Sequence, residues 1–568
     1  MEIINKIINE FLPGKKLSPW QHKLITWIFS EKSVTHLLEK NEAATGITWV
    51  ESVIDTFELN IDINSDAYNK IPATGPVIVV SNHPTLADGI SLIKTISKVR
   101  TDIKFIANHL LTIIFPQVKE LTIGIHNMNG SMGRKEYKEM NDHLKNGGVL
   151  IICPSGRLAS AGLTGLRESP WHAGFIQLAI KAKAAIVPIH IHGRNSIRYY
   201  ITALIYRPLS NLTIMREALR QRGNRLRITV CKQIDLSKIK KSDNDYSDIA
   251  AKIQRHLFLS GNGKKGIVPE LPPVAIPEKR SFLISELNEC EILKRMSDGK
   301  IVYLYHYNGS SYSAVLREIG RLREISYRSI GAGTGALRDN DIYDRDYYHI
   351  ILWDPNTLEI AGAYRVIYID EQIKNKGFAG LYSYSLFNYQ EGLIPNLESS
   401  IEIGRGFVQH QYQKTNAIDV LWKGIFCFIA KYPRCKNLLG VLSISQSYPT
   451  DAQKLIVSFY QKYFSEGNLL CSINGSYGFD CSSIDNIFSG DNFDADWKKL
   501  NEEIKKHGKD LPWPYKQAAR WFQPGGSKIH AFVKDDHFNS IAALNTYELS
   551  KLKEIYIKHF VYSVDGNN

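Results

Sequence analysis

The chain of 568 residues is 44% hydrophobic and 22% charged, a composition that is typical of folded proteins and excludes a disordered chain. This length exceeds one ordinary hydrophobic core, so we expect two domains of roughly 250 residues each. The formal net charge of +13 predicts attraction to polyanions such as anionic lipid, nucleic acid or an acidic carrier protein.

Simple patterns disfavour membrane-spanning, secreted and metal-binding proteins. No apolar run reaches the ~20 residues needed to cross a bilayer, and the sequence MEIINKIINEFLPGKK lacks the apolar core of a signal peptide. The seven cysteines contain no CxxC pair and no accompanying histidine spacing, so neither a disulfide framework nor a metal site is expected. We therefore expect a cytoplasmic protein that could rest on a membrane.

Residues 1–55 are expected to be helical and rich in aromatic and basic side chains. Trp20 and Trp27 stand among Lys15, Lys16 and Lys23. Such a mixture could seat the helices at an anionic lipid interface. The alternative is a helical hairpin that packs on its own domain.

The stretch PVIVVSNHPTLADGI, residues 76–90, places a polar pair after a buried strand. Apolar residues 77–80 predict the strand, Pro84 ends it, and a helical pattern begins at Ile90, so His83 and Asp88 are expected on the intervening loop. A histidine held by a carboxylate can take a proton from an alcohol, because the carboxylate fixes the ring tautomer and favours the imidazolium. The alternative is a structural hydrogen bond.

The motif NHPTLAD resembles the H-x4-D signature of the glycerolipid acyltransferase superfamily, which implies that His83 is the general base and Asp88 its orienter. Strand and helix patterns alternate from residue 102 to residue 193, and the strands are continuous apolar runs. This alternation predicts an α/β domain with a mostly parallel sheet.

Two later segments also resemble blocks of that superfamily. CPSGRLAS, residues 153–160, resembles the phosphate-recognition block, with Ser155 in place of its usual glutamate. Main-chain amides around Gly156 and the side chain of Arg157 could still hold an anionic head group, and a plain strand-to-helix turn is the alternative. IVPIHIHGRNS resembles the last block, in which Pro188 is expected to shape the wall of the pocket.

Four prolines in GNGKKGIVPELPPVAIPEKR predict a stiff linker over residues 261–280. It separates an N-terminal domain, 1–260, from a C-terminal domain, 281–568. In the second domain, leucines and isoleucines at helical spacing predict a helix over residues 313–331, and its interleaved arginines are expected to form a solvated face.

The segment GAGTGALRDNDIYDRDYYHIILWD contains a glycine-rich loop and an aspartate cluster before an alternating strand, and a hairpin is expected at Pro355-Asn356. Acidic clusters before hairpins can be merely turn-forming. Here the carboxylates, a hairpin arginine and a following Glu-x-x-Arg resemble the acyl-carrier-protein-dependent N-acyltransferases of the GNAT superfamily, the group that contains N-acylhomoserine lactone synthases and ornithine N-acyltransferases. The resemblance implies a GNAT-like α+β domain with a central mixed sheet.

The resemblance also assigns roles to five residues. Asp341 and Asp344 would hold the ammonium group of an amino acid, Glu402 would accept its proton, and Arg365 and Arg405 would hold its carboxylate or shape the cluster. Ala332 stands where the family has a glutamate in the glycine-rich loop.

In this order the two domains resemble bifunctional ornithine lipid synthases. The resemblance implies that the C-terminal domain N-acylates an amino acid, ornithine first among the candidates, with a 3-hydroxyacyl thioester. The N-terminal domain would then O-acylate the 3-hydroxyl of this lyso-aminolipid. No bound cofactor is expected; the donor would be acyl-ACP, with the acyl carrier protein as a partner, or acyl-CoA. The protein would lie on the anionic inner face of the cytoplasmic membrane.

Two other functions stay open: a lysophospholipid acyltransferase fused to an N-acyl amino acid synthase, and a non-catalytic scaffold that binds lipid or carrier. Nucleic acid is a poor partner, because the basic residues are spread along the chain.

Overall fold

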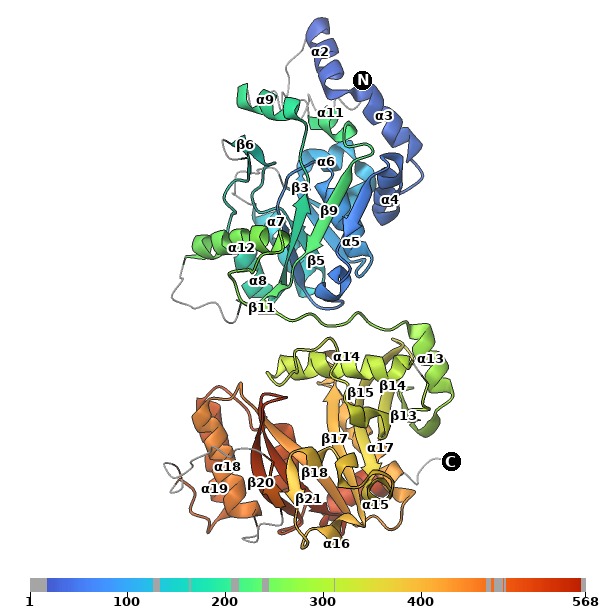
Figure 1. The fold of residues 1–568 in the computed structure, drawn as a ribbon, viewed down its shortest axis with the longest axis vertical. Coiled ribbons are helices and arrows are strands. Elements are labelled where there is room, and N and C mark those ends of the chain that lie inside the picture. Colours follow the sequence, from blue (N-terminus) through green and yellow to red (C-terminus); the bar gives the residue numbers. More distant parts are fainter. Residues whose placement is uncertain are drawn as a thin grey trace. The chain divides into compact units, whose positions relative to one another are not determined.

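The computed structural model describes residues 18–125, 133–162, 165–205, 214–236, 245–310, 312–465, 471–474, 484 and 487–562. The chain forms two compact units that divide between Ile276 and Pro277 (Figure 1). Lys15 and Lys16 of the expected N-terminal helices lie outside the described residues. In the described part, no helix is both long and apolar enough to cross a membrane.

The N-terminal unit is built on a mixed, mainly parallel sheet with the strand order β1-β9-β8-β2-β5-β3-β4. The strand β2 lies at its centre, parallel to β5 and to β8. Strand β9 pairs antiparallel with β8 and parallel with β1, and β10 and β11 extend the sheet by antiparallel pairing next to β8. The strands are β1 Asn60–Ile63, β2 Val77–Ser81, β3 Ile103–Asn108, β4 Thr122–Ile125, β5 Val149–Ile152, β8 Ala185–His192, β9 Arg225–Val230, β10 Gln233–Ile234 and β11 Glu270–Leu271.

Helices cover both faces of this sheet, so the unit has three layers. Because side chains alternate along a strand, β2 supplies Val77 and Val79 to one core and Ile78 and Val80 to the other. The first core also contains α4 Gly46–Thr56 and α5 Asp88–Ser97; the second contains α7 Arg134–Lys145, α8 Gly174–Ala182 and α12 Tyr246–Gly261. Burial on both faces explains why β2 is a continuous apolar run.

Short helices gather at one end of this unit. There α2 Pro19–Phe29 packs against α11 Ile214–Leu219, and α9 Ile197–Ile205 packs against the hairpin of β6 Ser160–Gly162 and β7 Gly165–Arg167 (Figure 1). Helix α3 Glu31–Lys40 connects α2 to α4, and α6 His109–Ile114 follows β3.

The C-terminal unit contains an eight-stranded sheet with the order β12-β13-β14-β15-β17-β18-β21-β20. All its neighbouring strands are antiparallel except β17 and β18. The strands are β12 Glu291–Arg295, β13 Ile301–His306, β14 Tyr348–Asp354, β15 Glu359–Tyr368, β17 Ser400–Val408, β18 Asn437–Ser445, β20 Ser527–Asp535 and β21 Ser540–Glu548; β16 Phe387–Tyr389 and β19 Cys471–Ile473 pair separately.

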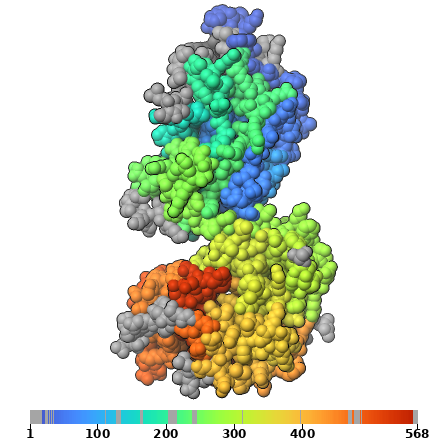
Figure 2. Space-filling model, viewed as in Figure 1, coloured from blue at the N-terminus to red at the C-terminus, as the bar shows by residue number. Residues whose placement is uncertain are grey.

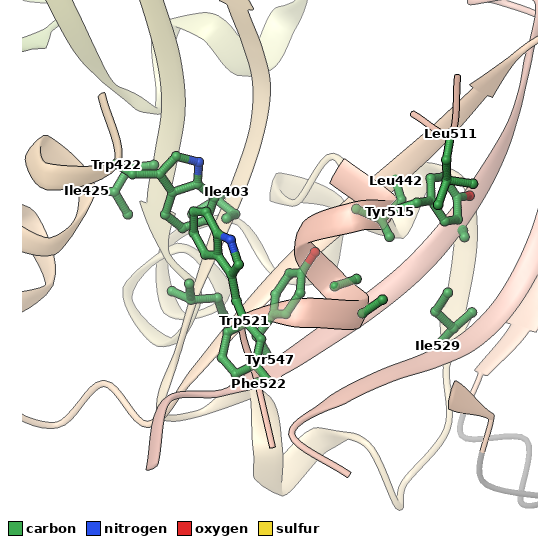
Figure 3. Packing of buried hydrophobic residues seen from close by; sticks show 14 of the residues in the cluster. Ile403, Trp422, Ile425, Leu442, Leu511, Tyr515, Trp521, Phe522, Ile529 and Tyr547 are labelled. Atoms are coloured by element: carbon green, nitrogen blue, oxygen red, sulfur yellow. The ribbon is translucent and has the colours of Figure 1, made fainter. Parts of the chain in front are cut away.

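Helices on both faces of this sheet bury its apolar side chains. On one face, α13 Arg280–Asn288 and α14 Ala314–Ser329 pack on β13 to β15. The opposite core contains α17 Ala417–Ala430, α18 Thr450–Phe464, α19 Phe493–Lys506 and α20 Trp513–Arg520. Figure 3 shows its packing around Trp422 and Trp521, whose ring centroids lie 5.0 Å apart. The shorter helices are α15 Ile369–Lys376, α16 Ile394–Leu397 and α21 Glu554–Ile557.

The architecture of both units confirms the expected fold class, and two local expectations need correction. Asp88 is the first residue of α5 rather than a loop residue, because its carboxylate accepts hydrogen bonds from the preceding turn and an acidic group is favoured at a helix N-terminus. The arginines of α14 do not all face solvent: Arg321 and Arg323 are buried in ion pairs.

Candidate active sites

His83 and Asp88 meet at the C-terminal end of β2. The ring Nδ1 of His83 lies 2.9 Å from Oδ2 of Asp88. Asp88 is fully buried and also accepts the main-chain N–H and the hydroxyl of Thr85, at 2.8 and 2.6 Å. Because Nδ1 faces a fixed carboxylate, Nε2 is the ring nitrogen available to take a proton.

A cavity of about 560 Å³ opens beside His83. Its wall combines apolar side chains with polar and charged ones. The lining residues are Asn82, His83, Pro84, Ala159, Leu166, Glu168, His190, Ile191, His192, Gly193, Arg194, Gln221, Asn224, Arg225, Leu226 and Phe258. Figure 2 shows the N-terminal unit in the view of Figure 1, with the segments that follow β5 coloured teal and green. An apolar cavity with a few convergent polar groups is the usual form of a site for a small molecule or lipid.

The two histidines of β8 line this cavity as uncharged groups. Burial, together with His192 and Arg227, lowers the pKa of His190 to about 3. Its Nδ1 lies 3.1 Å from Nε2 of His192, which also lies 3.0 Å from the main-chain oxygen of Gly261. The pair is therefore a hydrogen-bonded wall of the cavity.

The PSGR loop lies close to His83, but its predicted ligand groups do not line the cavity. Gly156 adopts φ +62° in a tight turn closed by its N–H and the oxygen of Cys153, 3.0 Å apart. Ser155 is buried, and its hydroxyl donates to the oxygen of Arg157 at 3.0 Å. Neither Gly156 nor Arg157 is among the residues of the cavity wall.

A carboxylate that the sequence did not single out, Glu168, lies in the wall instead. Its Oε1 accepts the main-chain N–H of His83 at 3.0 Å. Burial raises the pKa of Glu168 to about 7, although Ser155 and His83 act in the opposite direction. The Oε2 atom is buried and has no well-formed hydrogen bond within the described residues.

In the C-terminal unit, three arginines and three aspartates alternate in a closed ring of ion pairs. Arg323 of α14 contacts Asp339 at 2.6 Å and Asp344 at 2.7 Å. The ring then continues through Arg365 to Asp341, and from there through Arg405 back to Asp339. Those contacts are Asp344–Arg365 2.8 Å, Arg365–Asp341 2.5 Å, Asp341–Arg405 2.8 Å and Arg405–Asp339 3.3 Å.

The ring brings together four of the five residues predicted from the DxYD motif, the hairpin and the ExxR motif, and their charged groups are paired with one another or with Arg323 and Asp339. Burial opposes ionisation of Asp344, but the adjacent Arg323 and Arg365 outweigh it and hold its pKa well below the ordinary value. Asp341 is the most exposed of the three carboxylates, with 18% of its side chain accessible. An ammonium group entering this site would therefore reach Asp341 first.

A β-bulge explains how the side chains of Glu402 and Arg405 can point to the same face of the sheet. In a regular strand, residues three apart point to opposite faces. The pairing of β15 with β17 shifts between Ala363 and Arg365, opposite Arg405, which adopts φ +53°. A bulge adds one residue to a strand and re-aims the next side chain, so Arg405 reaches the aspartates.

Glu402 lies outside the ring and is held by a tyrosine and a main-chain amide. Its Oε2 accepts the hydroxyl of Tyr347 and its Oε1 accepts the N–H of Ser383, both at 2.9 Å. Burial raises the pKa of Glu402 above its ordinary value. The guanidinium of Arg365 lies 4.8 Å from the ring centroid of Tyr347, so Tyr347 connects Glu402 to the ion-pair ring.

The parallel strands β17 and β18 separate beside this network. Their pairing ends at Ile403 and Gly440, while each strand continues against its other neighbour, to Val408 and to Ser445. Beyond that point, β17 and β18 no longer pair with each other.

Arg323 and Glu168 are residues of these sites that the sequence analysis did not predict, for different reasons. Arg323 stands four residues after Ile319 and seven after Leu316, so the helical period already placed it on the buried face of α14. Glu168 follows the β6–β7 hairpin, and no spacing in the sequence links it to His83.

Each of the two units contains a match to a known family. Residues 62–192 match the acyltransferase family, and residues 322–423 match the acetyltransferase (GNAT) domain. The fold and these matches define an acyltransferase enzyme, with a glycerolipid-acyltransferase-like domain followed by a GNAT-like domain.

The chain is also similar to curated proteins. It is 32% identical over 254 residues to glycine N(alpha)-acyltransferase of Phocaeicola vulgatus, covering 42% of this chain and 77% of that protein. It is 24% identical over 215 residues to lyso-glycine lipid O-acyltransferase of the same organism, covering 36% and 76%. It is 28% identical over 129 residues to L-ornithine N(alpha)-acyltransferase of Agrobacterium fabrum, covering 22% and 42%. The chain belongs to the GNAT N-acyltransferase family that contains glycine N(alpha)-acyltransferase.

Proposed function

We propose that this protein is a bifunctional aminolipid synthase, which N-acylates an amino acid and then O-acylates the product. The observation that carries the proposal is that one chain matches two separate relatives, one named for N-acylation of glycine and one for O-acylation of a lyso-glycine lipid. The His83–Asp88 pair and the network around Glu402 supply a candidate site for each step.

In the first step, the amino nitrogen attacks the carbonyl carbon of a 3-hydroxyacyl thioester. The new C–N bond replaces the C–S bond, and the departing sulfur receives the proton that the amine loses. Glu402 accepts the amine proton, directly or through a water molecule, and its raised pKa brings it closer to the working pH of a general base. Main-chain amides at the opening between β17 and β18 bind the thioester oxygen.

In the second step, an alcohol replaces the amine as nucleophile and needs a stronger activating pair. His83 Nε2 takes the proton of the 3-hydroxyl as this oxygen attacks a second acyl thioester, and Asp88 stabilises the imidazolium that forms. The C–S bond breaks, and the departing sulfur receives the proton from His83. The product is a diacyl aminolipid.

The acceptor is an α-amino acid, and glycine and ornithine are the two candidates. Ornithine is the expectation from the sequence resemblance, whereas the match to the glycine enzyme covers more of this chain. Every aspartate of the ring is paired with an arginine in the described structure, which favours an acceptor without a second ammonium group. The mass of the lipid head group distinguishes the two.

The donor is an acyl thioester on acyl carrier protein or on coenzyme A. An acidic carrier protein and the anionic inner face of the cytoplasmic membrane both suit the net charge of +13. In the end region of the N-terminal unit, Trp20 and Trp27 of α2 and Ile197 of α9 are 66%, 64% and 77% exposed. Exposed aromatic and aliphatic side chains with adjacent basic ones suit a lipid interface.

The combined substitution Trp20→Ala and Trp27→Ala is expected to weaken binding to anionic phospholipid vesicles by at least about tenfold, since burying one large apolar side chain contributes about 1.5–3 kcal/mol. Co-sedimentation with vesicles measures the effect. Trp513→Ala, which removes a partly exposed tryptophan of the C-terminal unit, is the matched control. Equal vesicle binding by the double variant and the wild type would exclude α2 as a lipid contact.

The proposed function is tested by expression in a bacterium that lacks aminolipids, followed by mass spectrometry of the lipids. The wild type is expected to produce a monoacyl and a diacyl amino-acid lipid. Glu402→Gln is expected to lower both by about 10²-fold, because the amide loses the proton acceptor but can still accept the N–H of Ser383. An extract with new phosphatidic acid and no amino-acid lipid would instead support a lysophospholipid acyltransferase.

A further inference from the structure

The main chain of His83 is held on both sides by the segment that follows β5. Its N–H donates to Oε1 of Glu168 at 3.0 Å, and its carbonyl oxygen accepts the N–H of Ala159 at 2.9 Å. Both partners lie in the wall of the cavity with His83. Residues 153–160 were expected to hold a head group; instead, Ala159 of this segment and Glu168 hold the backbone of the candidate base.

Glu168 lies next to the position at which a carboxylate is absent from the PSGR loop. Ser155 stands where the related block has glutamate, and Glu168 interacts with Ser155 and with the indole of Trp171. Glu168 therefore supplies, from a different point in the chain, the carboxylate that the PSGR loop lacks. Its charge interacts favourably with His83.

We propose that Glu168 is a positioning residue of the O-acyltransferase site: it fixes the main chain of His83 and, as an anion beside the ring, favours the imidazolium that forms during proton transfer. This inference rests on the proposed O-acylation step. Asp88 orients the ring through Nδ1, whereas Glu168 acts through the backbone and through its charge, so the two carboxylates have separate roles.

The charge of Glu168 changes within the physiological range, because burial raises its pKa to about 7. Of the titratable groups, His83 and Cys153 interact with it directly, and the wall of the cavity adds His190, His192, Arg194 and Arg225. Burial, with added repulsion from Asp88 and Glu168, raises the pKa of Cys153 well above its ordinary value, and the pKa of His190 is about 3. Cys153 and His190 therefore stay uncharged near pH 7.

Two variants separate the hydrogen bond that Glu168 makes to the main chain of His83 from the effect of its charge. Glu168→Gln keeps an oxygen that can accept the N–H of His83 but removes the charge, whereas Glu168→Ala removes both. The full-length protein is assayed with N-(3-hydroxyacyl)glycine and an acyl thioester, and kcat and KM for O-acylation are measured from pH 5.5 to 9, a range that spans the Glu168 pKa of about 7. N-acylation by the same preparation reports on folding and concentration.

We expect kcat to fall by about 10²-fold in Glu168→Ala, because small displacements of a catalytic group are costly. In Glu168→Gln it falls by about tenfold above pH 7 and by less below it, because burial raises the pKa of Glu168 to about 7 and the wild-type carboxyl is itself uncharged at lower pH. KM for the acceptor stays near the wild-type value in both variants.

Equal losses in the two variants, with a loss in Glu168→Gln that does not change with pH, would overturn the inference, because only a structural role would remain. Wild-type rates in both variants would overturn it as well. A wild-type protein unable to acylate the hydroxyl is a different result, which would overturn the proposed function itself.

Discussion

His83→Ala is expected to lower the rate of O-acylation by about 10²–10⁴-fold, the usual contribution of a general base, while N-acylation continues at the wild-type rate. The reason is that Nε2 of His83 is the proton acceptor beside the cavity, with Nδ1 fixed by Asp88 at 2.9 Å. Cells that express the variant should accumulate the monoacyl amino-acid lipid. Mass spectrometry of the two lipids, normalised to protein, measures the change.

The chain supplies the controls for this experiment. His172→Ala removes an exposed histidine of the same unit that does not line the cavity, and both products should remain at wild-type levels. Asp88→Asn should reproduce the accumulation, because an amide cannot stabilise the imidazolium as a carboxylate does. If His83→Ala still makes the diacyl lipid at the wild-type rate, the second step does not use this site.

The fold could be predicted from the sequence because its signals are local. The continuous apolar run of β2 and the helix–strand alternation after it reflect burial on both faces of a parallel sheet, and the structure contains both. The spacing of Leu316, Ile319 and Leu322 likewise marks the buried face of α14. The ends of helices are harder to predict. Asp88 begins α5 because its side chain accepts a hydrogen bond from Thr85, and a hydropathy pattern does not register this hydrogen bond.

Spacing in the sequence predicted a contact only where both partners belong to one motif, whereas the grouping of Arg365 and Arg405 with the aspartates came from the family resemblance. His83 and Asp88 lie five residues apart, and the structure joins them directly. Arg323 and Glu168 act on residues 16 and 85 positions away, so tertiary folding alone brings them to Asp339 and to His83. The bulge at Arg405 is also invisible in a pattern with period two, although it determines which face that arginine joins.

Arg323→Met is expected to lower the free energy of unfolding of the C-terminal unit by about 3–5 kcal/mol, because it leaves the buried Asp339 and Asp344 with one arginine partner each instead of two. Arg323 is 1% exposed and bonds to both Asp339 and Asp344. The control is Arg317→Met on the same helix, whose ion pair with Glu278 is partly exposed and should contribute about 0–1 kcal/mol. Urea unfolding of the full chain, with hydrogen exchange in β14 and β15 to identify the unit, measures both.

The pH dependence of unfolding distinguishes loss of charge pairing from loss of packing. Since Arg323 and Arg365 overcome the effect of burial and hold the pKa of Asp344 well below its ordinary value, this carboxylate stabilises the folded state above the unfolded pKa of about 3.9. That contribution disappears as the pH falls through the folded pKa. The wild type should therefore lose more stability than Arg323→Met between neutral and acidic pH. Parallel losses in the two proteins would show that Arg323 stabilises the unit through packing alone.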